Sequence, residues 1–115
     1  MREYLRVMKA AADSTRVKIL KMLEMRDLCV CEIQSVLGIS QPSVSRHLRL
    51  LEDADLVRSE KEGMWTNFRL ARPEEVNQYS KAILNHLKDW LKDDQSVQNL
   101  LKQAGVVDRV TCSGQ

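Results

Sequence analysis

The sequence is poor in the residues that interrupt helices or mark special classes of protein. Its 115 residues include only two prolines and four glycines, so long stretches are free to be helical. No apolar run approaches the roughly 18 residues that would cross a bilayer, and no apolar segment typical of a secretory signal follows Met1. We therefore expect a single cytoplasmic domain, and we exclude membrane, collagen-like and disordered classes.

Strong charge of one sign is also absent. Eighteen Lys and Arg residues face 16 Asp and Glu residues, for a net charge of +2. Any nucleic-acid binding must therefore depend on where the charges are placed, and not on their sum. Three cysteines are an odd number, which argues against a disulfide framework and for free thiols or a metal site. No phosphate loop, HExxH pair or Ser/His/Asp arrangement is present, so we do not expect an enzyme.

Hydrophobic periodicity predicts a mainly α protein with one small β-hairpin. Asp13 and Ser40 are suited to be helix N-caps, Gly38 to end a helix, and Glu62-Gly63 to turn the hairpin. The expected helices cover residues 2–12, 14–24, 32–37, 41–54, 73–92 and 96–104, and the expected strands cover 57–61 and 64–70. Three helices followed by a hairpin indicate a winged helix-turn-helix.

The first and the fifth expected helices carry more apolar surface than one small core requires, so we interpret them as a dimer interface. Residues 1–92 then form the winged helix-turn-helix with its dimerisation helices, and residues 93–115 form a C-terminal helix and a flexible tail. The predicted interface residues are Leu5, Met8, Val76, Tyr79, Ile83, Leu87 and Trp90.

The helix that follows Ser40 has the composition of a DNA-recognition helix. Its polar face is rich in Ser, Gln and Arg and has no acid in its first nine residues, and such side chains pair with base edges or phosphates. A solvated surface helix is the alternative, but the hairpin directly downstream favours DNA. The predicted contacts to double-stranded DNA are Ser40, Gln41, Ser43, Ser45, Arg46, His47 and Arg49 on the helix, and Arg58, Lys61, Asn67 and Arg69 on the wing.

Several segments together resemble the ArsR/SmtB family of dimeric, metal-responsive winged-helix repressors. They are Leu28-Cys29-Val30-Cys31-Glu32-Ile33, Gly38, Ser40–Leu51, Leu56-Val57-Arg58 and the hairpin Lys61–Leu70. The resemblance covers roughly residues 4–92. It implies a homodimer that holds a palindromic operator when free of inducer and releases it when metal binds. The half-sites would lie about one helical turn apart.

Cys29 and Cys31 are the sharpest chemical feature of the sequence. Soft thiolates select thiophilic metals, and two residues so close form only a strained disulfide ring. Two helical residues at this spacing point about 200° apart, so binding one ion through both requires a site that starts before the helix or unwinds its first turn. Two small buried hydrophobes are the alternative reading.

The segment Leu28–Glu32 is similar to the signature of the arsenic-sensing branch of that family. The resemblance therefore implies that trivalent arsenic or antimony acts as the inducer, with no permanent cofactor. A third cysteine three residues further on is common in that branch, but this chain has Gln34 there. Cys112, from the same or the partner chain, is one candidate for the third thiolate, and a small thiol or water is the other.

Other readings stay open. The family also has a second, zinc-tuned site on its long dimer helix, for which Glu75, His86 and Asp89 are partial candidates here. The same cysteines could sense cadmium, zinc or lead, or could sense oxidants by forming a sulfenic acid or a disulfide with Cys112. An adaptor that binds protein through residues 76–91 is the alternative from another class.

Overall fold

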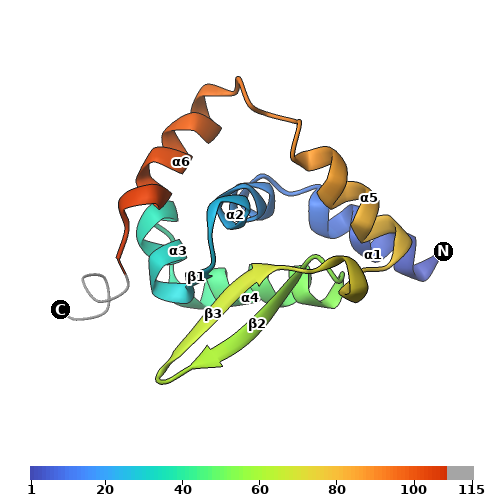
Figure 1. Ribbon diagram of the computed structural model, residues 1–115, viewed down its shortest axis with the longest axis horizontal. Coiled ribbons are helices and arrows are strands. Elements are labelled where there is room, and N and C mark those ends of the chain that lie inside the picture. The colour runs from blue at the N-terminus through green and yellow to red at the C-terminus, as the bar shows by residue number, and fades with distance from the viewer. Residues whose placement is uncertain (109–115) are drawn as a thin grey trace.

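A central helix organises residues 1–108, the part of the chain that the computed structural model describes. Helix α2 (Ser14–Met25) is capped by Asp13, whose carboxylate accepts the Arg16 amide at 3.1 Å, as the sequence predicts. Figure 1 shows α1 and α5 on one side of α2, and α3 and α6 on the other. Because neighbours surround it, five consecutive residues of α2, Ile19 to Leu23, are buried.

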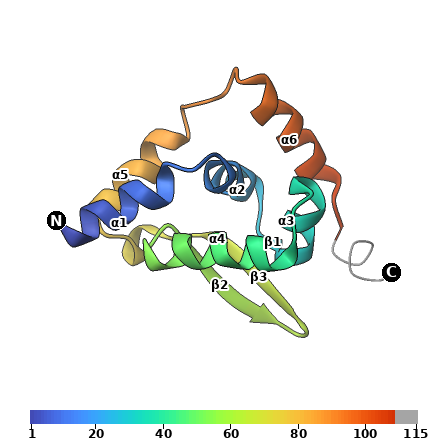
Figure 2. The ribbon, with the colours of Figure 1, turned by 180° about the vertical axis from the view of Figure 1, so that it is seen from behind.

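The predicted DNA-reading unit comprises α3 (Val30–Leu37) and α4 (Gln41–Asp53). Gly38 ends α3 with a φ of +70°, a left-handed conformation that glycine adopts without strain. Ser40 caps α4, and Pro42 lies in its first turn. Seen from behind in Figure 2, α4 runs beneath α2 from α3 toward α1 (Arg2–Ala11). The buried face of α4 comprises Val44, Leu48 and Leu51.

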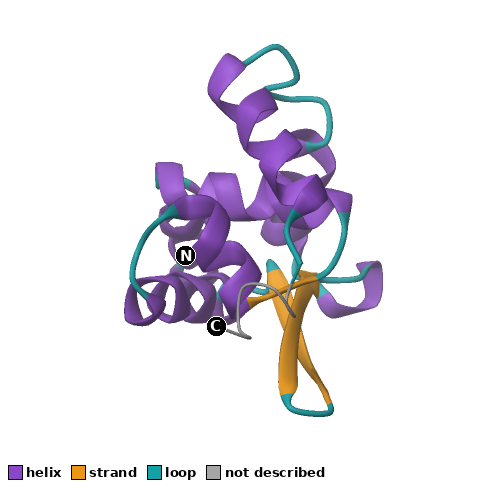
Figure 3. Ribbon diagram, turned by 90° about the vertical axis from the view of Figure 1, so that its left-hand side faces the viewer, coloured by secondary structure: helices purple, strands orange, loops and turns teal. Residues whose placement is uncertain are grey.

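The wing is the hairpin of β2 (Val57–Glu62) and β3 (Trp65–Leu70), which projects away from the helices in Figure 3. Glu62 pairs with Trp65 across a turn in which Gly63 has a φ of +63°. A third strand was not predicted. The two-residue β1 (Leu28–Cys29) pairs with β3 and completes a sheet of order β1-β3-β2. Helix α3 follows directly at Val30, two residues earlier than expected.

The long helix expected over residues 73–92 is wrong in its bounds. A short 3₁₀ turn, η1 (Pro73–Glu75), comes first, and α5 covers only Gln78–Leu87. Asn77 starts α5, because its side chain accepts the amides of the second and third helical residues. At the other end, Lys21 Nζ donates to the carbonyl of Leu87, the last residue of α5, at 2.9 Å and to that of Trp90, just beyond the helix, at 3.1 Å.

Helix α6 (Gln95–Val106) is slightly longer than the predicted 96–104 and packs on α2 and α3. Asp94 caps it, accepting the Val97 amide at 3.1 Å. Its buried face comprises Val97, Leu100 and Ala104. Within residues 1–108, no helix has the length and apolarity needed to cross a membrane. Cys112 lies outside the described residues.

Candidate functional site

The exposed face of α4 gathers the predicted base-reading side chains. Gln41, Ser45, Arg46 and Arg49 are all exposed, and at 100° per residue they lie within an arc of roughly 140°. The opposite face is fixed in the core, with Leu48 only 1% exposed. The helix N-terminus is closed locally, because Ser40 Oγ accepts the Ser43 amide at 3.3 Å and donates to Ser43 Oγ at 2.9 Å.

Two other predicted DNA contacts on the helix and the wing have partners within the protein. Nδ1 of His47 lies 3.1 Å from Arg16 Nη1, and the pKa of His47 is lowered, chiefly because the ring is partly buried. Arg16 also binds the carbonyls of Lys9 and Ala10 at the end of α1. Asn67 Nδ2 donates to Glu62 Oε1 at 3.1 Å.

The arginines of the wing are paired with acids. Arg58 binds Asp55 Oδ1 at 3.0 Å and two main-chain carbonyls. Arg69 holds both carboxylate oxygens of Glu75, at 2.7 and 2.9 Å, and also binds Glu60 Oε1 at 2.7 Å. This pairing raises the pKa of Arg69 and, with the Arg72 amide, lowers the pKa of Glu75 to about 2. Lys61 is exposed near the tip of the hairpin.

The bond to Arg69 also bears on the second metal site considered for this chain. Glu75 precedes α5, and both of its oxygens are committed to Arg69. His86 packs edge-to-face on Trp90, with ring centroids 5.4 Å apart. Among the described residues, no group of three His, Cys, Asp or Glu side chains is arranged to hold a metal ion. Glu75, His86 and Asp89 are therefore not brought together as ligands.

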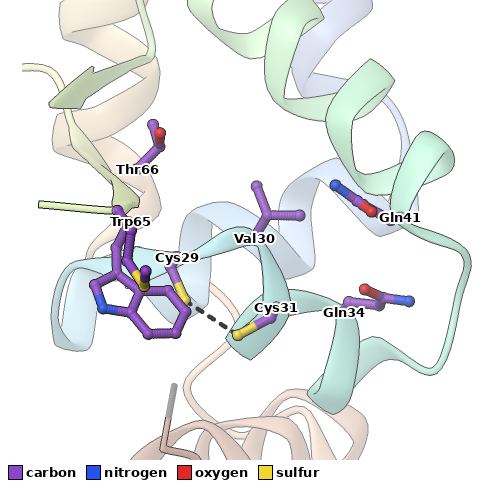
Figure 4. Close-up of a pocket in the computed structure, with 8 residues that line it drawn as sticks. Cys29, Val30, Cys31, Gln34, Gln41, Trp65 and Thr66 are labelled. Atoms are coloured by element: carbon purple, nitrogen blue, oxygen red, sulfur yellow. Dashed lines mark hydrogen bonds between the residues drawn. The ribbon is translucent and has the colours of Figure 1, made fainter. Parts of the chain in front are cut away.

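The structure brings Cys29 and Cys31 together without unwinding a helix. Cys29 is the N-cap of α3, with extended backbone angles (φ −90°, ψ 168°), and Cys31 lies in the first turn. Because Cys29 is outside the helix, its side chain turns back toward Cys31, and the two sulfur atoms lie 3.4 Å apart (Figure 4). Of the two geometries considered from the sequence, the site that starts before the helix is the one observed.

Glu32 and Arg26 hold Cys29 in this position. Glu32 Oε1 accepts the Cys29 amide at 2.9 Å, and the Glu32 amide faces the Cys29 sulfur, which forms a reciprocal capping box. Arg26 pairs with Glu32 at 3.2 Å and binds the carbonyls of Ala104 and Val107, at 3.1 and 2.7 Å. One guanidinium thus joins the end of α6 to the cysteine pair. The Cys-x-x-Glu spacing was the signal in the sequence for this capping box, but it is easily missed because cysteine is not a customary N-cap residue.

Burial governs the chemistry of Cys29, which is 2% exposed. Burial raises the pKa of its thiol, the Glu32 amide opposes this shift, and the Glu32 carboxylate adds to it. Cys29 is therefore protonated at neutral pH, and a metal that binds its sulfur must displace a proton. Cys29 is a free thiol, whereas Cys31 is disulfide-bonded in this structure. The two sulfur atoms, 3.4 Å apart, therefore become a donor pair for a thiophilic ion only when Cys31 is reduced.

The residues predicted for the dimer interface differ in how far their side chains are exposed on the protomer. Tyr79 meets Tyr4 edge-to-face, with ring centroids 5.3 Å apart, which joins α5 to α1. Leu5 and Trp90 are 43% and 50% exposed, whereas Leu87 is 5% exposed and packs within the protomer. The remaining predicted residues, Met8, Val76 and Ile83, are partly buried.

Comparison with known proteins identifies the family. Residues 13–59 match the model of the bacterial regulatory protein, arsR family. The chain is 32% identical over 111 residues to the arsenical resistance operon repressor of Escherichia coli (strain K12), covering 96% of this chain and 89% of that protein.

Solved structures agree with the fold. Reduced HlyU from Vibrio cholerae N16961 superposes with a TM-score of 0.65 and 31% identity, covering 79% of this chain and 90% of that one. The homodimeric winged helix-turn-helix DNA-binding domain of a possible ArsR-family regulator from Mycobacterium bovis superposes with a TM-score of 0.63 and 26% identity. The match covers 76% of this chain and 80% of that one. The chain described here belongs to the ArsR family of bacterial regulatory proteins, and its fold is a winged helix-turn-helix.

Proposed function

We propose that this protein is a homodimeric repressor that binds operator DNA and is released when trivalent arsenic or antimony binds Cys29 and Cys31. One observation carries the proposal: the two sulfur atoms lie 3.4 Å apart at the start of α3, the helix that precedes the recognition helix. The arsenical-resistance relative of high coverage supports the choice of inducer. A ligand held at this point acts on the DNA-reading unit directly.

The exposed residues of α4 and the wing would make the DNA contacts. Side chains of Gln41, Ser45, Arg46 and Arg49 face outward and suit base edges, while Lys61 and the hydroxyl groups of Ser40 and Ser43 suit phosphates. His47, Arg58 and Asn67 each have a partner inside the protein. For these three we propose that they position α4 and the wing against DNA.

The third ligand of the inducer would come from the tail. Val107, held by Arg26, is tied through Glu32 to Cys29. Five residues span at most roughly 18 Å, so we propose that Cys112 of the same chain completes a three-sulfur site, with a small thiol or water as the competing third ligand.

The remaining assignments follow from the same function. Residues 1–92 would form the DNA-binding domain with its dimer helices, and residues 93–115 the C-terminal helix and tail. The dimer would form through the exposed parts of α1 and α5, and the similar Mycobacterium bovis domain, which is homodimeric, supports a dimer of this fold. Such a regulator would act in the cytoplasm.

Fluorescence anisotropy of the reduced protein on a labelled duplex from upstream of its own gene tests this proposal. We expect tight, salt-dependent binding that arsenite abolishes. Cys29→Ser and Cys31→Ser should bind DNA but no longer release it, whereas Ser35→Ala, an exposed control on α3, should behave as wild type. Release of both cysteine variants by arsenite would refute the site, and absence of any DNA binding would refute the function.

The same assay separates the competing signals. Release by cadmium or lead at lower concentration than arsenite would keep the cysteine site and change its metal. Release by zinc alone would move the site away from the cysteines. Release by peroxide would indicate oxidation of the cysteines and would support a redox sensor.

A further inference from the structure

The cysteine pair opens into a cavity that is also lined by the wing and by the recognition helix. The cavity has a volume of about 300 Å³. Besides the two cysteines, its walls are Val30 and Gln34 of α3, Gln41 of α4, and Met64, Trp65 and Thr66 of the wing. Figure 4 shows the Trp65 ring beside the two sulfur atoms, with Gln34 and Gln41 on the other side. Three DNA-binding elements therefore meet at one small space.

Cys29 is also joined to the wing through the backbone. It pairs with Asn67 in the β1–β3 ladder, and Trp65 and Thr66 are the residues that precede Asn67 in β3. One residue thus contributes a sulfur atom to the cavity and a main-chain link to the strand that forms the cavity wall. A displacement of Cys29 would therefore reach β3 through the backbone, without any intervening side chain.

The wing is the part of this arrangement that can move at low cost. Beyond the β1 pairing it is only two-stranded, and Glu60 to Met64 at its end are exposed. A two-stranded hairpin is marginal without further packing. By contrast, α4 is anchored by fully buried residues such as Val44 and Leu51.

We propose that Trp65 forms the wing-side wall of the inducer site, so that the bound inducer weakens DNA affinity by displacing the β2–β3 hairpin. This inference rests on the proposed function and names how its site is coupled to DNA. An ion held by the sulfur atoms, with its third ligand, occupies the space beside the indole. The hairpin then adopts a position that does not fit against DNA, and by linkage DNA weakens inducer binding by the same factor.

The first test uses tryptophan emission. The chain has two tryptophans, and Trp90 lies beyond the end of α5, outside the cavity lining. Arsenite should change the emission of the wild type with the same saturation curve as DNA release, and Trp65→Phe should remove that change. Persistence of the full change in Trp65→Phe would overturn the proposal.

The second test measures coupling. The ratio of operator Kd values with and without saturating arsenite is determined for the wild type, for Trp65→Ala and for Trp65→Phe, with circular dichroism as the check on folding. We expect Trp65→Ala to reduce the ratio at least about fivefold, and Trp65→Phe, which keeps an aromatic wall, to retain most of it. A ratio for Trp65→Ala within about twofold of wild type would overturn the proposal.

The two proposals fail in different ways. If arsenite does not release the wild type, the proposed function fails and the inference falls with it. If arsenite releases the wild type and Trp65→Ala equally well, the inference alone fails.

Discussion

The recognition helix carries three basic residues, Arg46, His47 and Arg49, and the wing carries Arg58, Lys61 and Arg69. The two elements nevertheless present different surfaces. On α4, Arg46 and Arg49 are exposed. On the wing, Arg58 and Arg69 are paired with Asp55, Glu60 and Glu75, which leaves Lys61 as the exposed cation of the hairpin. The difference teaches that the basic residues of a sequence are only candidates for DNA contacts, and that neighbouring acidic residues decide which of these side chains are available to DNA.

The largest expected effect comes from the anchoring of α4. Leu48 is 1% exposed and belongs to the main core, so Leu48→Ala should lower the free energy of unfolding by about 2–5 kcal/mol. Chemical denaturation followed by circular dichroism measures it. Thr66→Ala on the wing is the matched control and should cost far less. Equal losses for the two variants would contradict the contrast between a rigid helix and a loosely held wing.

A smaller effect separates exposed from paired arginines. Arg46→Ala and Arg49→Ala should each weaken operator binding by about 1–3 kcal/mol if they read guanine. Arg58→Ala should weaken operator binding less than either of these variants, because Arg58 positions the wing without contacting DNA, and it should lower the melting temperature because it removes bonds to Asp55 and to two carbonyls. Anisotropy and thermal melts give both quantities, and a loss of affinity in Arg58→Ala equal to that in Arg46→Ala would refute the division.

The acid pairing of the wing predicts a pH dependence of stability. The pKa of Glu75 falls from 4.5 to about 2 through its bonds to Arg69 and Arg72. Its folded-state pKa is depressed, so its contribution is complete above about pH 4.5 and is lost as the pH falls toward 2. Glu75→Gln should lower stability at neutral pH and flatten the acid limb of a pH series. An unchanged acid limb would show that the pair contributes nothing.

The smallest expected effect concerns Lys61. Because one exposed ammonium on the hairpin suits a phosphate, Lys61→Ala should weaken binding uniformly across DNA sequences and reduce the salt slope by about one. Lys102→Ala, exposed on α6, is the control. A change of sequence preference in Lys61→Ala would instead place this residue at a base edge.

Much of the architecture could be predicted from local signals. Asp13, Gly38 and Ser40 mark helix boundaries through the amides and carbonyls that they satisfy, and the structure confirms all three. The change of period at Val57 likewise predicts the hairpin, which the structure confirms. These signals are legible because each acts within a few residues of the chain.

The bounds of α5 could not be predicted in the same way. An apolar stripe continues past Leu87 in the sequence, but the helix ends at Leu87, where Lys21, 66 residues earlier in the chain, binds the carbonyl of Leu87 and that of Trp90 just beyond the helix. The strand β1 is equally hidden, because two residues have no period and the partner strand begins at Trp65. Both features depend on groups that only the folded chain brings together.

The sequence by itself determined the winged helix-turn-helix and led to the proposal of Cys29 and Cys31 as the inducer-binding pair, because periodicity, caps and residue chemistry are local properties. Only the tertiary structure decided that the two sulfur atoms meet at 3.4 Å, that Arg69 is neutralised, and that Trp65 walls the cysteine cavity. The sulfur distance depends on the extended backbone of Cys29, which β1 holds against β3. The cavity depends on the packing of α3 against β3, and the pairing of Arg69 depends on Glu60 of β2 and Glu75 of η1. Only the folded chain brings these segments together.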